Sequence, residues 1–155
     1  MMVDFSEAYP VYGKHSSPEQ AMKYHNRYPV IYHEAVREVL DEFSSIYTFT
    51  RAGFTGTPKY AQSLWAGDQN MNFRKNTGLR SCLIAMLSSG LTGYSNTHCD
   101  IGGYTFVGSL NLSVRTKTLM TRWMQLSAFS PVFRTHEGNS PEKTIQVFSD
   151  DEIAQ

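Results

Sequence analysis

Apolar positions recur along the chain at two spacings, one typical of helices and one typical of strands. Over residues 29–43, apolar side chains fall three or four residues apart and charged residues occupy the other face, which predicts an amphipathic helix. The same spacing predicts helices over residues 77–91 and 116–128. Ser17 followed by Pro18 is typical of a helix start, so an earlier helix is expected there.

Short runs of β-branched and aromatic residues separate these helices and predict strands. The predicted strands cover residues 1–3, 46–50, 63–66, 93–99 and 131–133. Between the second and the third strand, Gly56 and Pro58 indicate a loop with room for one helical turn. A last helix is expected to begin at Asp150. Strands that alternate with helices favour an α/β fold with a parallel sheet.

A polar or charged residue follows each predicted strand. These residues are Asp4, Arg51, Asp68, Asp100 and His136. Ligands of such folds bind beyond the carboxyl ends of the strands, so the five side chains are candidate site residues. A complete eight-stranded barrel takes about 250 residues. The chain has five predicted strands, so we expect it to form the later part of such an α/β barrel and not a whole one.

Composition and charge narrow the possible partners. The 14 basic and 14 acidic residues balance, so no nucleic-acid or membrane partner is expected. No apolar run reaches the ~20 residues of a membrane span. Cys82 and Cys99 do not form a disulfide framework, and His98 beside Cys99 has no second Cys or His at metal-ligand spacing. Gly102-Gly103 lacks the lysine of a phosphate-binding loop. We expect no metal and no cofactor.

Five short motifs stand at the ends of the predicted strands. They are Asp4-Phe5-Ser6-Glu7, Arg51-Ala52-Gly53, Trp65-Ala66-Gly67-Asp68, Asp100-Ile101-Gly102-Gly103-Tyr104 and Arg134-Thr135-His136. Together they resemble the motifs of glycoside hydrolase family 31, the α-glucosidase family, and their details resemble its sulfoquinovosidase branch most closely. The resemblance extends through nearly the whole chain. It implies that residues 1–155 form one partial catalytic barrel, about strands 4 to 8 of a (β/α)8 TIM barrel, without the first strands and the final helix. One departure is Ser6, because the family commonly has Gly beside its nucleophile.

The resemblance implies two catalytic carboxylates. Asp4 matches the nucleophilic Asp after the fourth barrel strand, and Asp68 matches the acid/base Asp after the sixth. Glycoside cleavage needs one ionised carboxylate and one protonated acid, because its transition state resembles an oxocarbenium ion. The stretch from Asp4 to Asp68 corresponds to about two βα units of ~30 residues each. Trp65 is expected to supply the apolar surroundings that keep an acid such as Asp68 protonated.

The resemblance also implies five substrate-binding residues, which are Arg51, Trp65, Asp100, Tyr104 and His136. In the sulfoquinovosidase branch the Tyr that matches Tyr104 helps to hold the sulfonate group. Each residue also has a structural interpretation: an ordinary ion-pair partner for Arg51, a core residue for Trp65, and a turn residue for Asp100. Asp4 and Asp68 likewise fit turn caps, His136 fits a structural histidine, and Glu7 is expected to support its loop or to orient Arg51.

The resemblance therefore predicts a retaining α-glycosidase that acts on α-glucoside-type sugars, with α-sulfoquinovosides as candidate substrates and a carbohydrate as partner. The alternative is an inactive, truncated barrel that at most binds sugars. An open barrel exposes strand edges and lacks half of its layered core, so we expect the isolated chain to be inactive and aggregation-prone. A nucleotide-binding open sheet would need a Gly-rich loop after its first strand, and the sequence has none there.

Overall fold

A computed structural model describes residues 1–12, 14, 21–43, 45–108 and 113–154. The chain divides into two compact units, and each is described by itself. The first unit comprises Met1–Leu64 with Thr92–Tyr94, and the second comprises Trp65–Leu91 with Ser95–Gln155. The predicted helix start at Ser17 and Pro18 lies outside the described residues. No helix in the described part of the chain is long and apolar enough to cross a membrane.

The first unit is built on parallel strands. β1 (Met2–Val3) pairs with β2 (Phe49–Thr50), and β2 pairs with the start of β3 (Leu64–Trp65). All three lie inside predicted strands, but each is only two residues long. In the second unit the chain after β3 continues the ladder, because the N–H of Ala66 donates to the carbonyl of His98 in β4 (Thr97–His98). The strand order is β1-β2-β3-β4.

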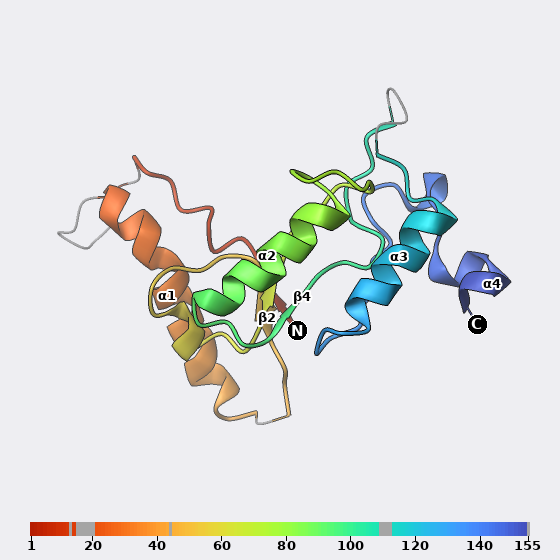
Figure 1. Cartoon of the computed structure of the whole chain (residues 1–155). Coiled ribbons are helices and arrows are strands. Elements are labelled where there is room, and N and C mark those ends of the chain that lie inside the picture. Colours follow the sequence, from red (N-terminus) through yellow and green to blue (C-terminus); the bar gives the residue numbers. More distant parts are fainter. Residues whose placement is uncertain (13, 15–20, 44, 109–112, 155) are drawn as a thin grey trace. The chain divides into compact units, whose positions relative to one another are not determined.

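The long helix of the first unit is α1 (Ala21–Leu40), drawn in orange in Figure 1, which packs beside the 3-10 turn η1 (Thr57–Lys59). The helical turn predicted in this loop is thus confirmed. The predicted start of α1 at Pro29 is wrong, because the helix begins eight residues earlier and continues through Pro29. Proline has no N–H to donate to the carbonyl four residues before it, but the rest of the ladder persists on both sides.

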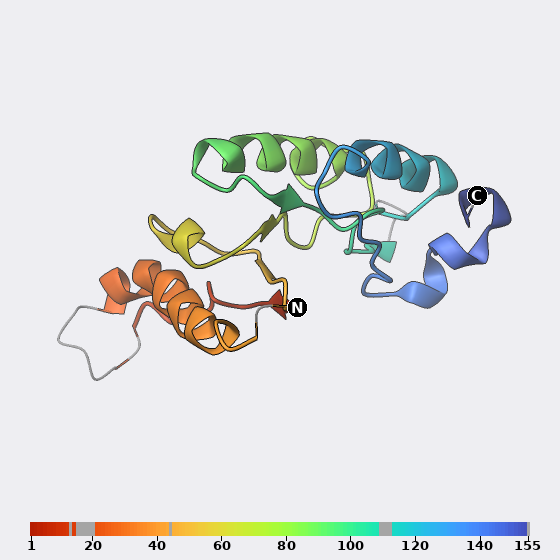
Figure 2. The same cartoon turned by 90° about the horizontal axis from the view of Figure 1, so that it is seen from below.

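The second unit contains α2 (Leu79–Leu91) and α3 (Lys117–Ser127), which lie on the same side of β4 (Figure 2). α3 matches its prediction closely, because the side chain of Thr116 caps the helix by accepting a hydrogen bond from the N–H of Leu119. Their apolar faces meet in one core. Its buried members are Met71, Cys82, Cys99, Ile101, Leu119, Met120, Trp123 and Ile153.

Two predictions for the second unit need correction. The apolar face predicted for α2 is only partly buried, since Cys82 is fully buried but Leu83 and Leu87 are exposed. The strand predicted at 131–133 is absent, although all three residues are described. A single parallel bridge joins Ile101 to Thr135 instead. Pro131 has no N–H to offer a ladder, which is a physical reason for pairing only beyond it.

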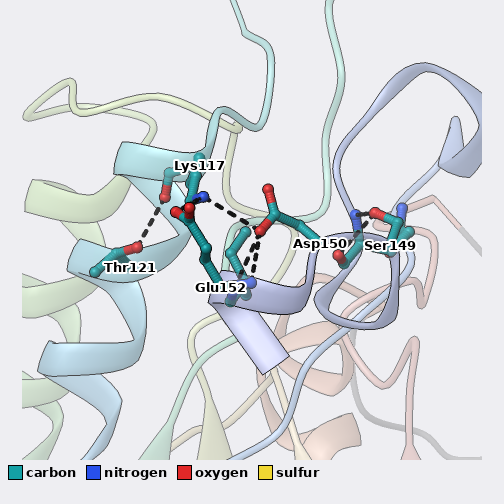
Figure 3. Close-up of polar contacts among 7 residues, drawn as sticks. Lys117, Thr121, Ser149, Asp150 and Glu152 are labelled. Carbon is teal, nitrogen blue, oxygen red and sulfur yellow. Dashed lines mark hydrogen bonds and ion pairs between the residues drawn. The ribbon is translucent and has the colours of Figure 1, made fainter. Parts of the chain in front are cut away.

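The end of the chain packs against α3. α4 (Asp151–Ala154) starts beside Asp150, as predicted, and the Asp150 carboxylate accepts hydrogen bonds from the N–H groups of Glu152 and Ile153. Figure 3 shows Lys117 of α3 reaching Asp150, at 3.2 Å, and Glu152. Two 3-10 turns, η3 (Pro141–Lys143) and η4 (Val147–Ser149), precede this helix.

Candidate active site

Asp4 lies directly after β1 and is the first predicted site residue of the first unit. Its Oδ1 accepts a hydrogen bond from the N–H of Phe5 at 2.8 Å and lies 3.0 Å from Nε of Arg51. Side-chain exposure is 20% for Asp4 and 18% for Arg51, so solvent reaches both only in part. The carboxylate is therefore oriented by one backbone donor and one guanidinium, and it is accessible to a ligand.

Arg51 follows β2 and bridges two acidic residues. Its Nη2 lies 2.7 Å from Oε1 of Glu7, and its Nε also donates to that oxygen at 2.7 Å. The guanidinium thus compensates the charges of Asp4 and Glu7 together. The prediction that Glu7 orients Arg51 agrees with this geometry. Charge-assisted bonds of this kind are about twice as strong as neutral ones, so they fix the guanidinium well.

Phe5 has an unusual backbone beside the candidate nucleophile. Its φ is 61°, in the left-handed region that non-glycine residues seldom adopt. The guanidinium carbon of Arg51 lies 4.6 Å from the centroid of its exposed ring, a cation–π contact. A strained residue persists when its surroundings hold it in place, and such residues cluster at functional sites. Phe5 therefore supports a functional interpretation of the Asp4 loop.

Asp68 is the first candidate acid of the second unit, and it is exposed. It follows Gly67, whose φ of 76° closes a tight turn in which the N–H of Gln69 donates to the carbonyl of Gly67. The carbonyl of Asp68 accepts a hydrogen bond from Oγ1 of Thr105 at 3.3 Å. Backbone contacts on both sides thus fix the position from which its carboxylate extends.

Asp100 contrasts with Asp68 because it is fully buried, with 0% of its surface exposed. Burial raises the pKa of its carboxyl, while the positive charge of Arg134 acts in the opposite direction. Arg134 forms an ion pair with Oδ1 of Asp100, and its guanidinium lies 5.7 Å from the centroid of the Trp65 ring. Trp65 is itself buried, so its indole forms a wall behind this ion pair.

Tyr104 and His136 lie together in the second unit. Their rings meet edge to face, with centroids 5.0 Å apart and planes at 85°. The N–H of Gly138 donates to Nδ1 of His136 at 3.0 Å, so the neutral ring carries its proton on Nε2. That nitrogen can donate to a ligand hydroxyl. Direct contact of either ring with a ligand stays a prediction.

Arg115 was not predicted, but it holds the turn that carries Tyr104. It is fully buried, its Nε donates to the carbonyl of Gly102, and its Nη2 donates to the carbonyl of Gly103. Gly102 has a φ of 87°, and a Cβ there would lie 2.6 Å from Nε of Arg115. Nη1 also donates to Gln146. An arginine 12 residues beyond Gly103 carries no local sequence signal of this role.

The structure thus groups the predicted residues within each unit. Asp4 and Arg51 meet in the first unit. In the second, the charge of Asp68 contributes to the electrostatic surroundings of Asp100. The sequence analysis missed Arg134 as a site residue, although it stands two positions before His136 in the same motif. Among the described residues, no three His, Cys, Asp or Glu side chains are placed to hold a metal ion.

Comparison with known proteins shows to which family the chain belongs. A model of the glycosyl hydrolases family 31 TIM-barrel domain matches residues 1–155. The chain belongs to glycoside hydrolase family 31. The expected family and the partial α/β barrel are therefore confirmed.

Within family 31, several individual proteins are similar to this chain. A sulfoquinovosidase of Agrobacterium fabrum is 39% identical over 98% of this chain, and one of Escherichia coli is 40% identical over 97%. The structure of a family 31 sulfoquinovosidase from E. rectale, in complex with an aza-sugar inhibitor, superposes with a TM-score of 0.90 at 37% identity over 98% of this chain. The chain spans 22–23% of the length of these relatives.

Proposed function

We propose that the protein is a retaining α-glycosidase that hydrolyses O-glycosidic bonds of α-glucoside-type sugars by double displacement. The observation that carries the proposal is the family 31 match over residues 1–155 together with carboxylates beyond β1 and β3. Sulfoquinovosides are the proposed substrates, because the two sulfoquinovosidases quoted above are 39% and 40% identical to this chain.

In the first step, the Asp4 carboxylate attacks the anomeric carbon and forms an ester with the sugar. At the same time Asp68 gives its proton to the glycosidic oxygen, and the alcohol leaves. The hydrogen bond from Phe5 and the ion pair with Arg51 support this role, since they orient Asp4 without covering it. Arg51 is the proposed contact to a sugar hydroxyl on this side of the site.

In the second step, Asp68, now ionised, takes a proton from water as the water oxygen attacks the anomeric carbon. The ester to Asp4 breaks, and the sugar is released with its original anomeric configuration. Asp100 and His136 are the proposed partners of the sugar hydroxyls, and Tyr104 is the proposed contact to a sulfonate. Trp65 acts as the wall that excludes water behind them.

The test compares hydrolysis of 4-nitrophenyl α-sulfoquinovoside and 4-nitrophenyl α-glucoside by the full-length protein. We expect preference for the sulfonated substrate, a product with retained configuration in NMR spectra, and loss of activity in Asp4→Asn. Asp68→Asn should lose about 10²–10⁴-fold in rate on an alkyl glycoside, whose leaving group needs a proton.

Preference for the glucoside would keep the glycosidase and discard the sulfonate role of Tyr104. A product of inverted configuration would reject the mechanism. Sugar binding without hydrolysis by the wild type would favour the alternative of an inactive sugar-binding barrel.

A further inference from the structure

A buried polar chain leads from α1 to the residue before Arg51. Thr50 is the last residue of β2 and is 1% exposed. Its Oγ1 accepts a hydrogen bond from the N–H of Ala52 at 3.2 Å and lies 3.2 Å from the carbonyl of Ala52. The Thr50 hydroxyl therefore bridges to the backbone of Ala52 and constrains the backbone of Arg51, which lies between Thr50 and Ala52.

His33 of α1 completes this chain. Its Nε2 lies 2.9 Å from Oγ1 of Thr50, and its side chain is almost fully buried, at 3% exposure. The ring is also oriented by Tyr32, whose ring meets it edge to face with centroids 5.6 Å apart. Burial lowers the pKa of His33 to about 4, so the ring is neutral at pH 7 and can donate to or accept from the hydroxyl.

Burying this polar pair costs free energy that an apolar pair of equal size would not cost. What the pair adds is direction, because a hydrogen bond fixes both the distance and the angle between α1 and the end of β2. Arg51 needs such a fixed backbone, since its guanidinium must reach Asp4 at 3.0 Å and Glu7 at 2.7 Å together.

We propose that His33 is a positioning residue for Arg51, acting through the hydroxyl of Thr50, and that Arg51 in turn orients Asp4. His33 contacts no substrate in this proposal. The inference rests on the proposed function, because it assigns His33 a part in presenting the nucleophile. His33 lies 29 positions after Asp4 in the sequence and was not among the predicted site residues.

The test uses two matched pairs of variants in the full-length protein. Thr50→Val removes the hydroxyl at equal size, and Thr50→Ser keeps it; His33→Phe removes the ring nitrogens, and His33→Gln keeps a polar group. Because misplacing a catalytic group by about 1 Å can cost about 100-fold, we expect Thr50→Val and His33→Phe to lower kcat by about 10–100-fold with a smaller change in KM. Thr50→Ser and His33→Gln should remain within about threefold of wild type.

Two further measurements separate positioning from folding. The double variant His33→Phe/Thr50→Val should lose no more activity than either single variant, since both break the same chain. Thr55→Val, an exposed threonine of the same loop, serves as the control and should behave as wild type. Losses that add up, or a folded His33→Phe enzyme with wild-type kcat, would overturn the proposal.

A crystal structure of Thr50→Val tests the inference without any assay. We expect the Arg51 guanidinium to move out of hydrogen-bond distance of Asp4, and an unchanged contact would overturn the positioning role. Parallel assays of wild type and Asp4→Asn keep the two proposals apart. If Asp4→Asn retains activity, the proposed function fails, whatever the His33 variants do.

Discussion

The two units hold their candidate site residues by different means. In the first, Asp4 and Arg51 are each about one-fifth exposed, and ion pairs at the ends of two-residue strands orient them. In the second, Asp100 is fully buried and the turn after it is held by the buried Arg115. The candidate site residues of the first unit therefore contribute little to the stability of that unit. Those of the second unit are part of its core.

Arg115 and Arg51 make the largest expected contrast. Arg115→Met leaves the buried carbonyls of Gly102 and Gly103 without donors, and we expect it to lower the free energy of unfolding by about 3 kcal/mol. Arg51→Met breaks partly exposed ion pairs and should cost less than about 1 kcal/mol, yet abolish activity. Native-state hydrogen exchange of amides in α3 and α1 measures each unit. Equal losses in the two variants would break the comparison.

The pH dependence of the free energy of unfolding tests whether the stability of both units also depends on buried neutral histidines. Burial lowers the pKa of His33 in the first unit to about 4, and burial with the charge of Arg134 does the same for His98 in the second. The unfolded chain, with a histidine pKa of 6.5, binds more protons between these values. Stability is therefore complete above pH 6.5 and declines as the pH falls toward 4.

Between pH 7 and pH 5 we expect each histidine to account for a loss on the order of 2 kcal/mol. Hydrogen exchange at the two pH values measures the loss in each unit. His33→Gln should flatten the pH dependence of α1 amides only, and His98→Gln that of α3 amides only. If the stability of a unit kept its pH dependence after its own histidine was replaced, the assignment of that dependence to the histidine would be wrong.

Substitutions at two glycines of the second unit have expected effects on stability of opposite sign. Gly102→Ala forces a Cβ against Arg115 at a φ of 87°, and we expect a loss of about 1–3 kcal/mol. Gly90 lies in α2 with open space around its Cβ position, so Gly90→Ala should stabilise by about 0.5–1 kcal/mol. Thermal unfolding of both variants provides the check. Loss of stability in both variants would contradict the expected difference between the two positions.

Local signals in the sequence predicted much of this architecture. The helical spacing of apolar residues located α3, and the polar residues after β1 and β2 marked Asp4 and Arg51 correctly as neighbours in space. The start of α1 could not be placed at its true position, because Pro29 usually marks a first turn and only the surrounding fold allows it inside a helix.

Long-range contacts could not be predicted from local patterns. Arg115 reaches Gln146 across 31 positions, and His33 reaches Thr50 across 17. Neither residue type signals such a contact, since buried arginines and histidines depend on partners that only the folded chain supplies. The strand predicted over 131–133 is also absent, and Pro131, which has no N–H to offer a ladder, is the physical reason given above.

The placement of the tryptophans gives the second unit an optical signal of its own. Both tryptophans of the chain, Trp65 and Trp123, belong to the second unit, where one faces the Arg134 guanidinium and the other donates to the thiol of Cys99. The stacked tyrosines along α1 belong to the first. Within residues 1–155, both indoles therefore lie in the second unit, and indole emission follows the surroundings of that unit's tryptophans.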